Sequence, residues 1–126
     1  MKSDKIKQAV IHELIFDEDI IITYGDQKQL SRWYKNRNID DIEIGKYTYG
    51  FTELLESEDR KFRHIHFSVY GFSIIVHETN HLAFEILDEK GIKLSKETKE
   101  IFAYYQDFLA GKCRDYMEKW TKKGKK

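Results

Sequence analysis

Residues 74–87 decide the fold, and they read IIVHETNHLAFEIL. Apolar residues lie on both sides of the five-residue segment HETNH, and their spacing predicts a helix that is apolar almost all round. Ser73 can cap the start of this helix, and Gly91 can end it. We therefore expect a buried helix that carries two histidines and a glutamate.

The histidines of this segment are spaced as metal ligands. Residues four apart in a helix project from the same face, so the imidazoles of His77 and His81 can bind one cation. Glu78 lies on an adjacent edge, where it can reach a metal-bound water as a general base. The pattern indicates zinc and hydrolysis of a polarised carbonyl, most naturally an amide. The alternative is a pair of core histidines hydrogen-bonded to backbone or carboxylate groups.

A catalytic zinc takes three protein ligands and leaves the fourth place for water. Glu100 is the best candidate for the third ligand, because it follows on the next predicted helix after a short loop. Glu97, Asp88 and Glu85 are lesser choices. A glutamate in a first helical turn can equally be a solvated residue that is favourable to the helix dipole. Tyr104, one turn further on, could donate a hydrogen bond to a developing oxyanion and is a candidate catalytic residue.

The stretch from Ile74 to Leu109 resembles the small gluzincin-like HExxH proteins encoded by phages and mobile elements. It is also similar to the metallopeptidase domains that cleave phage or element repressors. The resemblance rests on the motif and on residues 100–104, EIFAY, and covers about a third of the chain. It implies zinc bound by His77, His81 and Glu100, with Glu78 as general base. The thermolysin-like pattern would place an aspartate four residues after the third ligand, where this chain has Tyr104.

The rest of the chain predicts an α+β domain. Strands are expected at residues 20–24, 46–52 and 64–70, the last two as an antiparallel hairpin, with a short helix after Asp26. The last helix, capped by Ser95, should bury one continuous face and end or bend at Gly111. That face comprises Ile101, Tyr104, Tyr105, Phe108 and Leu109. We expect residues 1–120 to form one zincin-like domain, in which a short antiparallel or mixed sheet packs on the motif helix and the C-terminal helix. Residues 121–126 should be a disordered basic tail.

Residues 64–70 alternate polar and apolar side chains, which predicts a strand with one buried face. We expect His64 and His66 on the polar face, where one of them could line the cleft. The strand immediately precedes the motif helix, so it is also the candidate sheet edge for an extended peptide substrate. The alternative is an interior strand whose hydrogen bonds are all used.

Composition argues against several partner classes. Twenty-two basic residues balance 22 acidic ones, so neither nucleic acid nor an anionic membrane is favoured as a partner. No stretch approaches the roughly 18 apolar residues of a membrane span, and residues 1–9 lack the apolar core of a signal peptide. Cys113 is the single cysteine and cannot form an intramolecular bridge, which fits a reducing compartment.

We therefore expect a cytoplasmic zinc metallopeptidase that acts on a protein or peptide substrate. The alternative function is that of a catalytically silent zincin-like protein, which binds a metal or a partner in phage–host or mobile-element biology. The sequence does not fix the oligomeric state.

Overall fold

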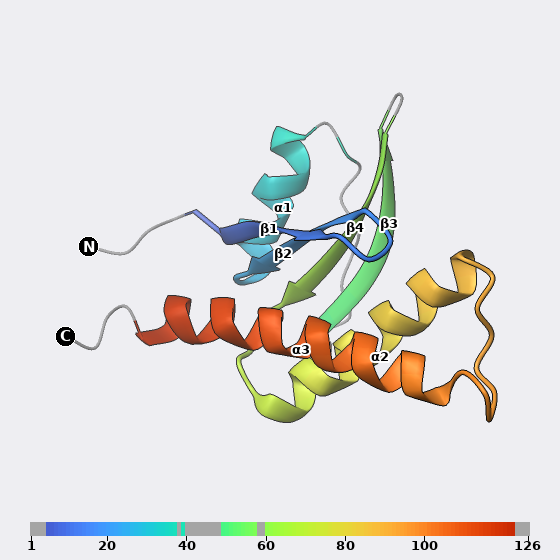
Figure 1. Ribbon diagram of the computed structural model, residues 1–126. Coiled ribbons are helices and arrows are strands. Elements are labelled where there is room, and N and C mark those ends of the chain that lie inside the picture. The colour runs from blue at the N-terminus through green and yellow to red at the C-terminus, as the bar shows by residue number, and fades with distance from the viewer. Residues whose placement is uncertain (1–4, 38, 40–48, 58–59, 123–126) are drawn as a thin grey trace. The chain divides into compact units, whose positions relative to one another are not determined.

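A computed structural model describes residues 5–37, 39, 49–57 and 60–122 of the chain (Figure 1). The chain divides into two compact units, Met1–Val69 and Tyr70–Lys126. In the described residues, the first unit contains a four-stranded sheet and one helix, and the second contains two helices. The expected α+β class is confirmed, whereas a single zincin-like domain stays a prediction. No helix among the described residues is long and apolar enough to cross a membrane.

The sheet of the first unit is mixed, with strand order β1-β2-β4-β3. Its strands are β1 (Lys7–Glu13), β2 (Glu18–Tyr24), β3 (Gly50–Ser57) and β4 (Arg60–Phe67). β1 pairs antiparallel with β2, and β3 pairs antiparallel with β4, whereas β2 and β4 run parallel. The expected antiparallel hairpin is therefore confirmed, although residues 46–48 of its first expected strand lie outside the described residues and β3 continues to Ser57. The β-branched residues at 20–22 form the centre of β2, where Ile20 and Ile22 are fully buried.

The expected sheet edge is wrong. β4 lies between β2 and β3, so both of its sides are paired within the sheet, and the edges are β1 and β3. β4 also ends at Phe67 rather than at residue 70. An interior strand has no free row of N–H and C=O groups to offer a peptide. The substrate groove expected along residues 64–70 is therefore absent.

Helix α1 (Gln27–Asn36) covers one face of this sheet. Asp26 caps it as expected, in a capping box in which the Asp26 carboxylate accepts from the Gln29 backbone and the Gln29 side chain accepts from the Asp26 backbone. Its inward residues Leu30, Trp33 and Tyr34 form a core cluster with Leu55 of β3. This cluster is the core that α1 forms with one face of the sheet.

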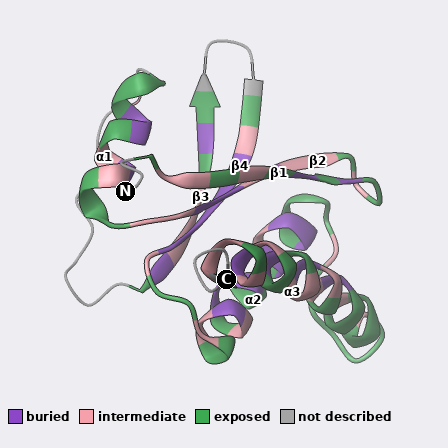
Figure 2. Ribbon diagram, turned by 90° about the vertical axis from the view of Figure 1, so that its left-hand side faces the viewer, coloured by how far each residue is buried: buried purple, intermediate pink, exposed green. Residues whose placement is uncertain are grey.

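The second unit is a pair of helices, α2 (Phe72–Glu89) and α3 (Lys99–Lys122). α2 begins after Gly71 rather than at Ser73, and it ends before Gly91, whose φ of 84° is the left-handed conformation that favours glycine at a helix end. α3 continues through Gly111 without interruption. The expectation that Gly111 ends or bends this helix is not supported. Figure 2 shows buried and exposed residues alternating around both helices.

The buried face of α3 differs from the expected one. It contains Tyr105, Leu109, Cys113 and Met117, which recur every four residues, whereas Ile101 and Tyr104 are exposed. A four-residue repeat forms one stripe along a helix, and Tyr104 lies beside this stripe rather than on it. Burial raises the pKa of the Cys113 thiol to about 12.

Candidate metal centre

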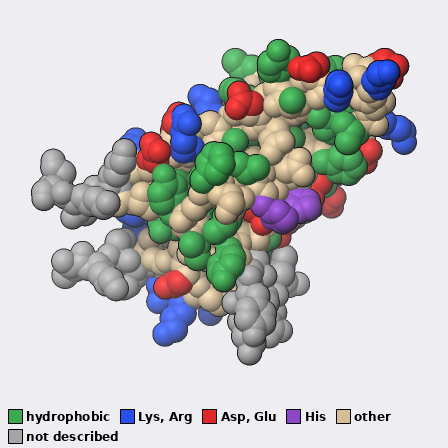
Figure 3. Space-filling view, turned by 90° about the horizontal axis from the view of Figure 1, so that it is seen from below, with side chains coloured by type: hydrophobic (Ala, Val, Ile, Leu, Met, Phe, Trp, Pro, Cys, Tyr) green, Lys and Arg blue, Asp and Glu red, His purple; other side chains and the backbone are tan. Residues whose placement is uncertain are grey.

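His77 and His81 lie together on the exposed side of α2. Their ring centroids are 4.7 Å apart in an edge-to-face arrangement, and 66% of the His77 side chain is exposed. In Figure 3, histidine side chains gather at the molecular surface with apolar side chains nearby. Both residues belong to one helix, so their spacing follows directly from the helical repeat. The expected pair of neighbouring imidazoles is present, although α2 is not buried all round.

Glu78 points toward the buried side of the same helix. Only 7% of the residue is exposed, and its Oε2 atom lies 4.0 Å from His77 Nε2. Burial raises the pKa of this carboxyl; the two histidines oppose the shift, and the negative charge of Glu85 adds to it. Glu78 therefore binds a proton more readily than a solvated glutamate does. A raised pKa is what a general base needs when it works near neutral pH.

No third candidate ligand is grouped with the two histidines among the described residues. Glu100 is exposed in the first turn of α3, and the described residues contain no group of three His, Cys, Asp or Glu side chains placed to hold a metal. Of the lesser candidates, Glu97 and Asp88 are exposed. Glu85 is half-buried and follows His81 by four residues, so it continues the stripe of His77 and His81 along α2. The described residues therefore place two candidate ligands, His77 and His81, side by side without a third beside them.

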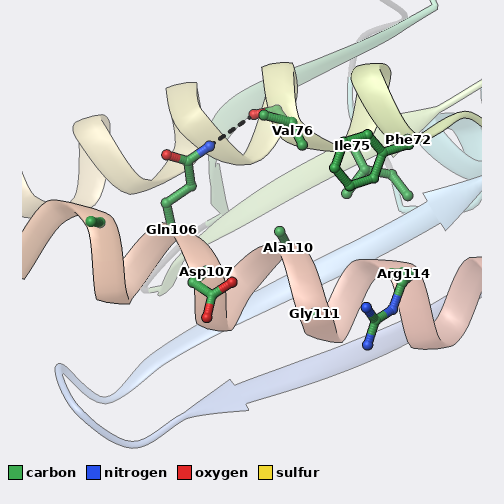
Figure 4. Close-up of a pocket in the computed structure, with 9 residues that line it drawn as sticks. Phe72, Ile75, Val76, Gln106, Asp107, Ala110, Gly111 and Arg114 are labelled. Carbon is green, nitrogen blue, oxygen red and sulfur yellow. Dashed lines mark hydrogen bonds between the residues drawn. The ribbon is translucent and has the colours of Figure 1, made fainter.

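Tyr104 is 72% exposed on α3. Within the described part of the chain its hydroxyl makes no hydrogen bond to the motif residues, and its expected role as an oxyanion donor stays a prediction. A pocket of the helical unit lies elsewhere on α2 and α3 (Figure 4). This groove of about 540 Å³ is lined by Ile75, Val76 and Gln106 among others, but by neither histidine. Gln106 Nε2 donates to the Val76 carbonyl at 3.1 Å and so joins the two helices beside it.

The first unit contains a buried polar network that the sequence pattern does not reveal. Thr23 Oγ1 lies 2.7 Å from His64 Nε2 and 2.8 Å from His66 Nδ1, so one hydroxyl bridges two histidines. Glu53 Oε2 lies 2.6 Å from His64 Nδ1 and accepts a hydrogen bond from the Tyr34 hydroxyl at 2.6 Å. The strand register explains this meeting, because Thr23 pairs with His66 and Glu53 pairs with His64.

Both histidines are buried, so the expectation that they face solvent is wrong. α1 covers their side of the sheet, and the Trp33 indole stacks on the His64 ring with centroids 4.3 Å apart. Burial lowers the pKa of His64 despite the neighbouring Glu53 carboxylate. Burial, with a smaller contribution from His64, lowers the pKa of His66 to about 3, and the Gly25 backbone offsets part of this shift. The Nε2 atom of His66 nevertheless has no hydrogen-bond partner among the described residues.

The order carboxylate, imidazole, hydroxyl in Glu53, His64 and Thr23 is that of a hydrolytic triad. However, Thr23 and His64 have no exposed surface. A nucleophile must reach its substrate, so this chain of hydrogen bonds is a structural network that ties β2, β3, β4 and α1 together. Its members come from four elements, and a sequence window around any one of them contains no sign of the others.

The chain matches no protein-family model, and no curated protein or solved structure matches it significantly.

Proposed function

We propose that this chain is a zinc-dependent hydrolase of peptide bonds whose metal is bound by His77 and His81. The observation that carries the proposal is the pair of adjacent imidazoles on one exposed helix face, 4.7 Å apart between ring centroids. Neutral imidazoles suit zinc, and ligands four residues apart on a helix fit its coordination sphere. The donor set fits zinc at two positions and needs a third.

Glu100 is the proposed third ligand on the family resemblance, and Glu85 is the alternative that the helix stripe favours. A bound zinc would supply Lewis acidity toward a carbonyl and toward water. Glu78 would act as the general base, because its buried carboxyl has a raised pKa and lies beside His77. The imidazoles of His77 and His81 would hold the site on α2, and the rigid helix would keep them in register.

Zinc content and hydrolysis test this proposal separately. Elemental analysis of protein purified without chelator should give one zinc per chain, and His77→Ala and His81→Ala should each lose it. His12→Ala is the matched control, because His12 is an exposed histidine of the first unit. Glu100→Ala and Glu85→Ala decide the third ligand, since only the true ligand's loss weakens zinc binding. Wild-type protein that neither carries nor takes up zinc would exclude the metal site.

Glu78→Gln should keep zinc and the fold but lose hydrolysis, because an amide cannot accept the proton of water. The assay needs a verified substrate, which can be found by screening a peptide library for cleavage by the wild-type protein. Equal activity of Glu78→Gln and wild type would remove Glu78 from the mechanism.

A second candidate is a metal-binding or partner-binding protein without catalysis. Two observations favour it over the peptidase: β4 has no free edge for a peptide, and Glu100 does not join the histidine pair. Zinc bound through His77 and His81, together with no hydrolysis of any library peptide, would support this candidate.

A further inference from the structure

A pocket of about 250 Å³ lies in the first unit, between the start of β1 and the exposed side of α1. Among the described residues, its lining is rich in cationic and amide side chains and contains no carboxylate. The cations are Lys5, Arg32 and Arg37, and the amides are Gln8, Gln29 and Asn36. Since the whole chain has a net charge of zero, three positive charges around one small cavity are a local concentration that the composition does not require.

The guanidinium of Arg37 is held in place at this pocket. Its Cζ atom lies 4.3 Å from the centroid of the Trp33 ring, and Nη2 donates to Gln8 Oε1 at 3.1 Å. The Trp33 indole N–H donates to the same oxygen at 3.0 Å. Gln8 Oε1 thus accepts two hydrogen bonds, which directs the amide nitrogen of Gln8 to other partners. A fixed guanidinium loses less conformational entropy when it binds a ligand than a flexible one does.

Several donors at the pocket have no acceptor in the described part of the chain. The Arg37 guanidinium makes no ion pair there; it stacks on Trp33 and donates through Nη2 to Gln8, so its remaining N–H groups have no acceptor among these residues. The amide groups of Gln8 and Asn36 donate no hydrogen bond within the same residues. Donors of this kind bind water or an anion. The negative end of α1 lies beside Arg37, but a helix end carries only about half an elementary charge, which three cationic side chains outweigh.

We propose that this pocket binds a phosphate group, either as the free ion or as the terminal group of a small phosphate monoester. A phosphate carries nearly two negative charges at neutral pH and several acceptor oxygens, which matches three cations and several amide donors. A carboxylate carries one charge and two oxygens and would leave donors unused. The cavity is large enough to admit a group of this size. The inference is independent of the metal centre, because all the lining residues belong to the first unit.

Trp33 lines the pocket and reports its occupancy. The chain has two tryptophans, so Trp120→Phe leaves Trp33 as the only indole fluorophore. At constant ionic strength, inorganic phosphate and glycerol phosphate should each produce a saturable change in its fluorescence, whereas acetate should not. Arg37→Gln and Arg32→Gln should each weaken phosphate binding about tenfold or more, because each removes a charged donor.

Lys35→Gln is the matched control, since it removes the same charge from α1 at a residue that does not line the pocket. It should leave the affinity for phosphate within about twofold of wild type. If only inorganic phosphate binds, the ligand of the pocket is the free ion. If glycerol phosphate binds as well, the pocket accepts the terminal phosphate group of a monoester. The proposal is overturned if phosphate gives no saturable change, if acetate binds as well, or if Lys35→Gln weakens binding as much as Arg37→Gln. Circular dichroism of each variant separates lost binding from lost fold.

Discussion

At the scale of single residues, the buried network around Thr23 marks the limit of sequence reasoning. The alternation at residues 64–67 correctly predicts a strand, because side chains of a strand alternate between its faces. It cannot say that α1 covers the face of His64 and His66, since Trp33 and Tyr34 lie about 30 residues earlier in the chain. The helical spacing of His77 and His81 needs no such distant information, and it is present in the structure.

The Thr23 hydroxyl should contribute strongly to the free energy of unfolding, because two buried histidines share it as a hydrogen-bond partner. Thr23→Val replaces the hydroxyl by a methyl group and leaves His64 Nε2 and His66 Nδ1 without their shared partner. Each unsatisfied buried polar group costs about 1–3 kcal/mol, so the free energy of unfolding should fall by about 2–5 kcal/mol. Thr23→Ser keeps the hydroxyl and loses one methyl group, at a cost of about 1 kcal/mol. Urea unfolding measures both variants, and equal losses would show that the network contributes little.

Acid should destabilise the fold through the same network. The pKa of His66 is about 3 in the folded chain but about 6.5 when unfolded. The unfolded chain therefore binds more protons between these values, and the free energy of unfolding falls as the pH decreases, by about 1.4 kcal/mol per pH unit for one such group. His64, whose pKa is also lowered, acts in the same direction.

Urea unfolding at a series of pH values from about 7 to about 4 measures this slope. His66→Gln should make it shallower by about 1.4 kcal/mol per pH unit below the unfolded pKa, because one titrating group is lost. If His66→Gln left the slope unchanged, His66 would not be the residue that takes up protons on unfolding.

At the scale of elements, local signals predict helix starts and stops well where they act through the backbone. The capping box at Asp26 and the left-handed Gly91 are both visible in the sequence, because side-chain caps and glycine ends depend only on neighbouring residues. Gly111 wrongly suggests a helix end, because a glycine costs a helix about 1 kcal/mol but does not interrupt its hydrogen bonds. Neighbouring turns of α3 are sufficient to carry the helix through it.

The two glycines should therefore respond oppositely to alanine. Gly91→Ala places a side chain at φ 84°, where L residues are strained, and should lower the free energy of unfolding by about 1 kcal/mol. Gly111→Ala adds a methyl group in open space within α3 and should raise it by about 1 kcal/mol. Thermal unfolding of the pair makes the comparison. Changes of the same sign would contradict the assignment of either the helix end or the helix interior.

At the scale of the whole molecule, the strand order is what the sequence leaves open. The parallel pairing of β2 with β4 brings together residues about 40 positions apart, with α1 and β3 between them. Only global packing selects this order over a simple meander, and the difference removes the substrate groove along β4. The local patterns of strand and helix residues, by contrast, are sufficient to predict the α+β class.

Zinc binding should stabilise the folded chain if His77 and His81 hold the metal. A ligand that binds only the folded state adds about 2.7 kcal/mol at a free concentration one hundred times its dissociation constant. The melting temperature should therefore rise with buffered zinc in wild type and in His12→Ala, but not in the double variant His77→Ala, His81→Ala. An identical rise in the double variant would assign the metal to other residues.

The alkylation rate of Cys113 measures how often the folded structure opens. Thiol reagents attack the thiolate, and Cys113 is both buried and, with a pKa of about 12, almost entirely protonated at neutral pH. Its alkylation must wait for the structure to open, so the labelling rate is the opening equilibrium multiplied by the rate for an unfolded thiol. Gly111→Ala should lengthen the labelling half-time and Gly91→Ala should shorten it, in water and without denaturant. The labelling half-time of this single thiol therefore reports how readily the structure around α3 opens under native conditions.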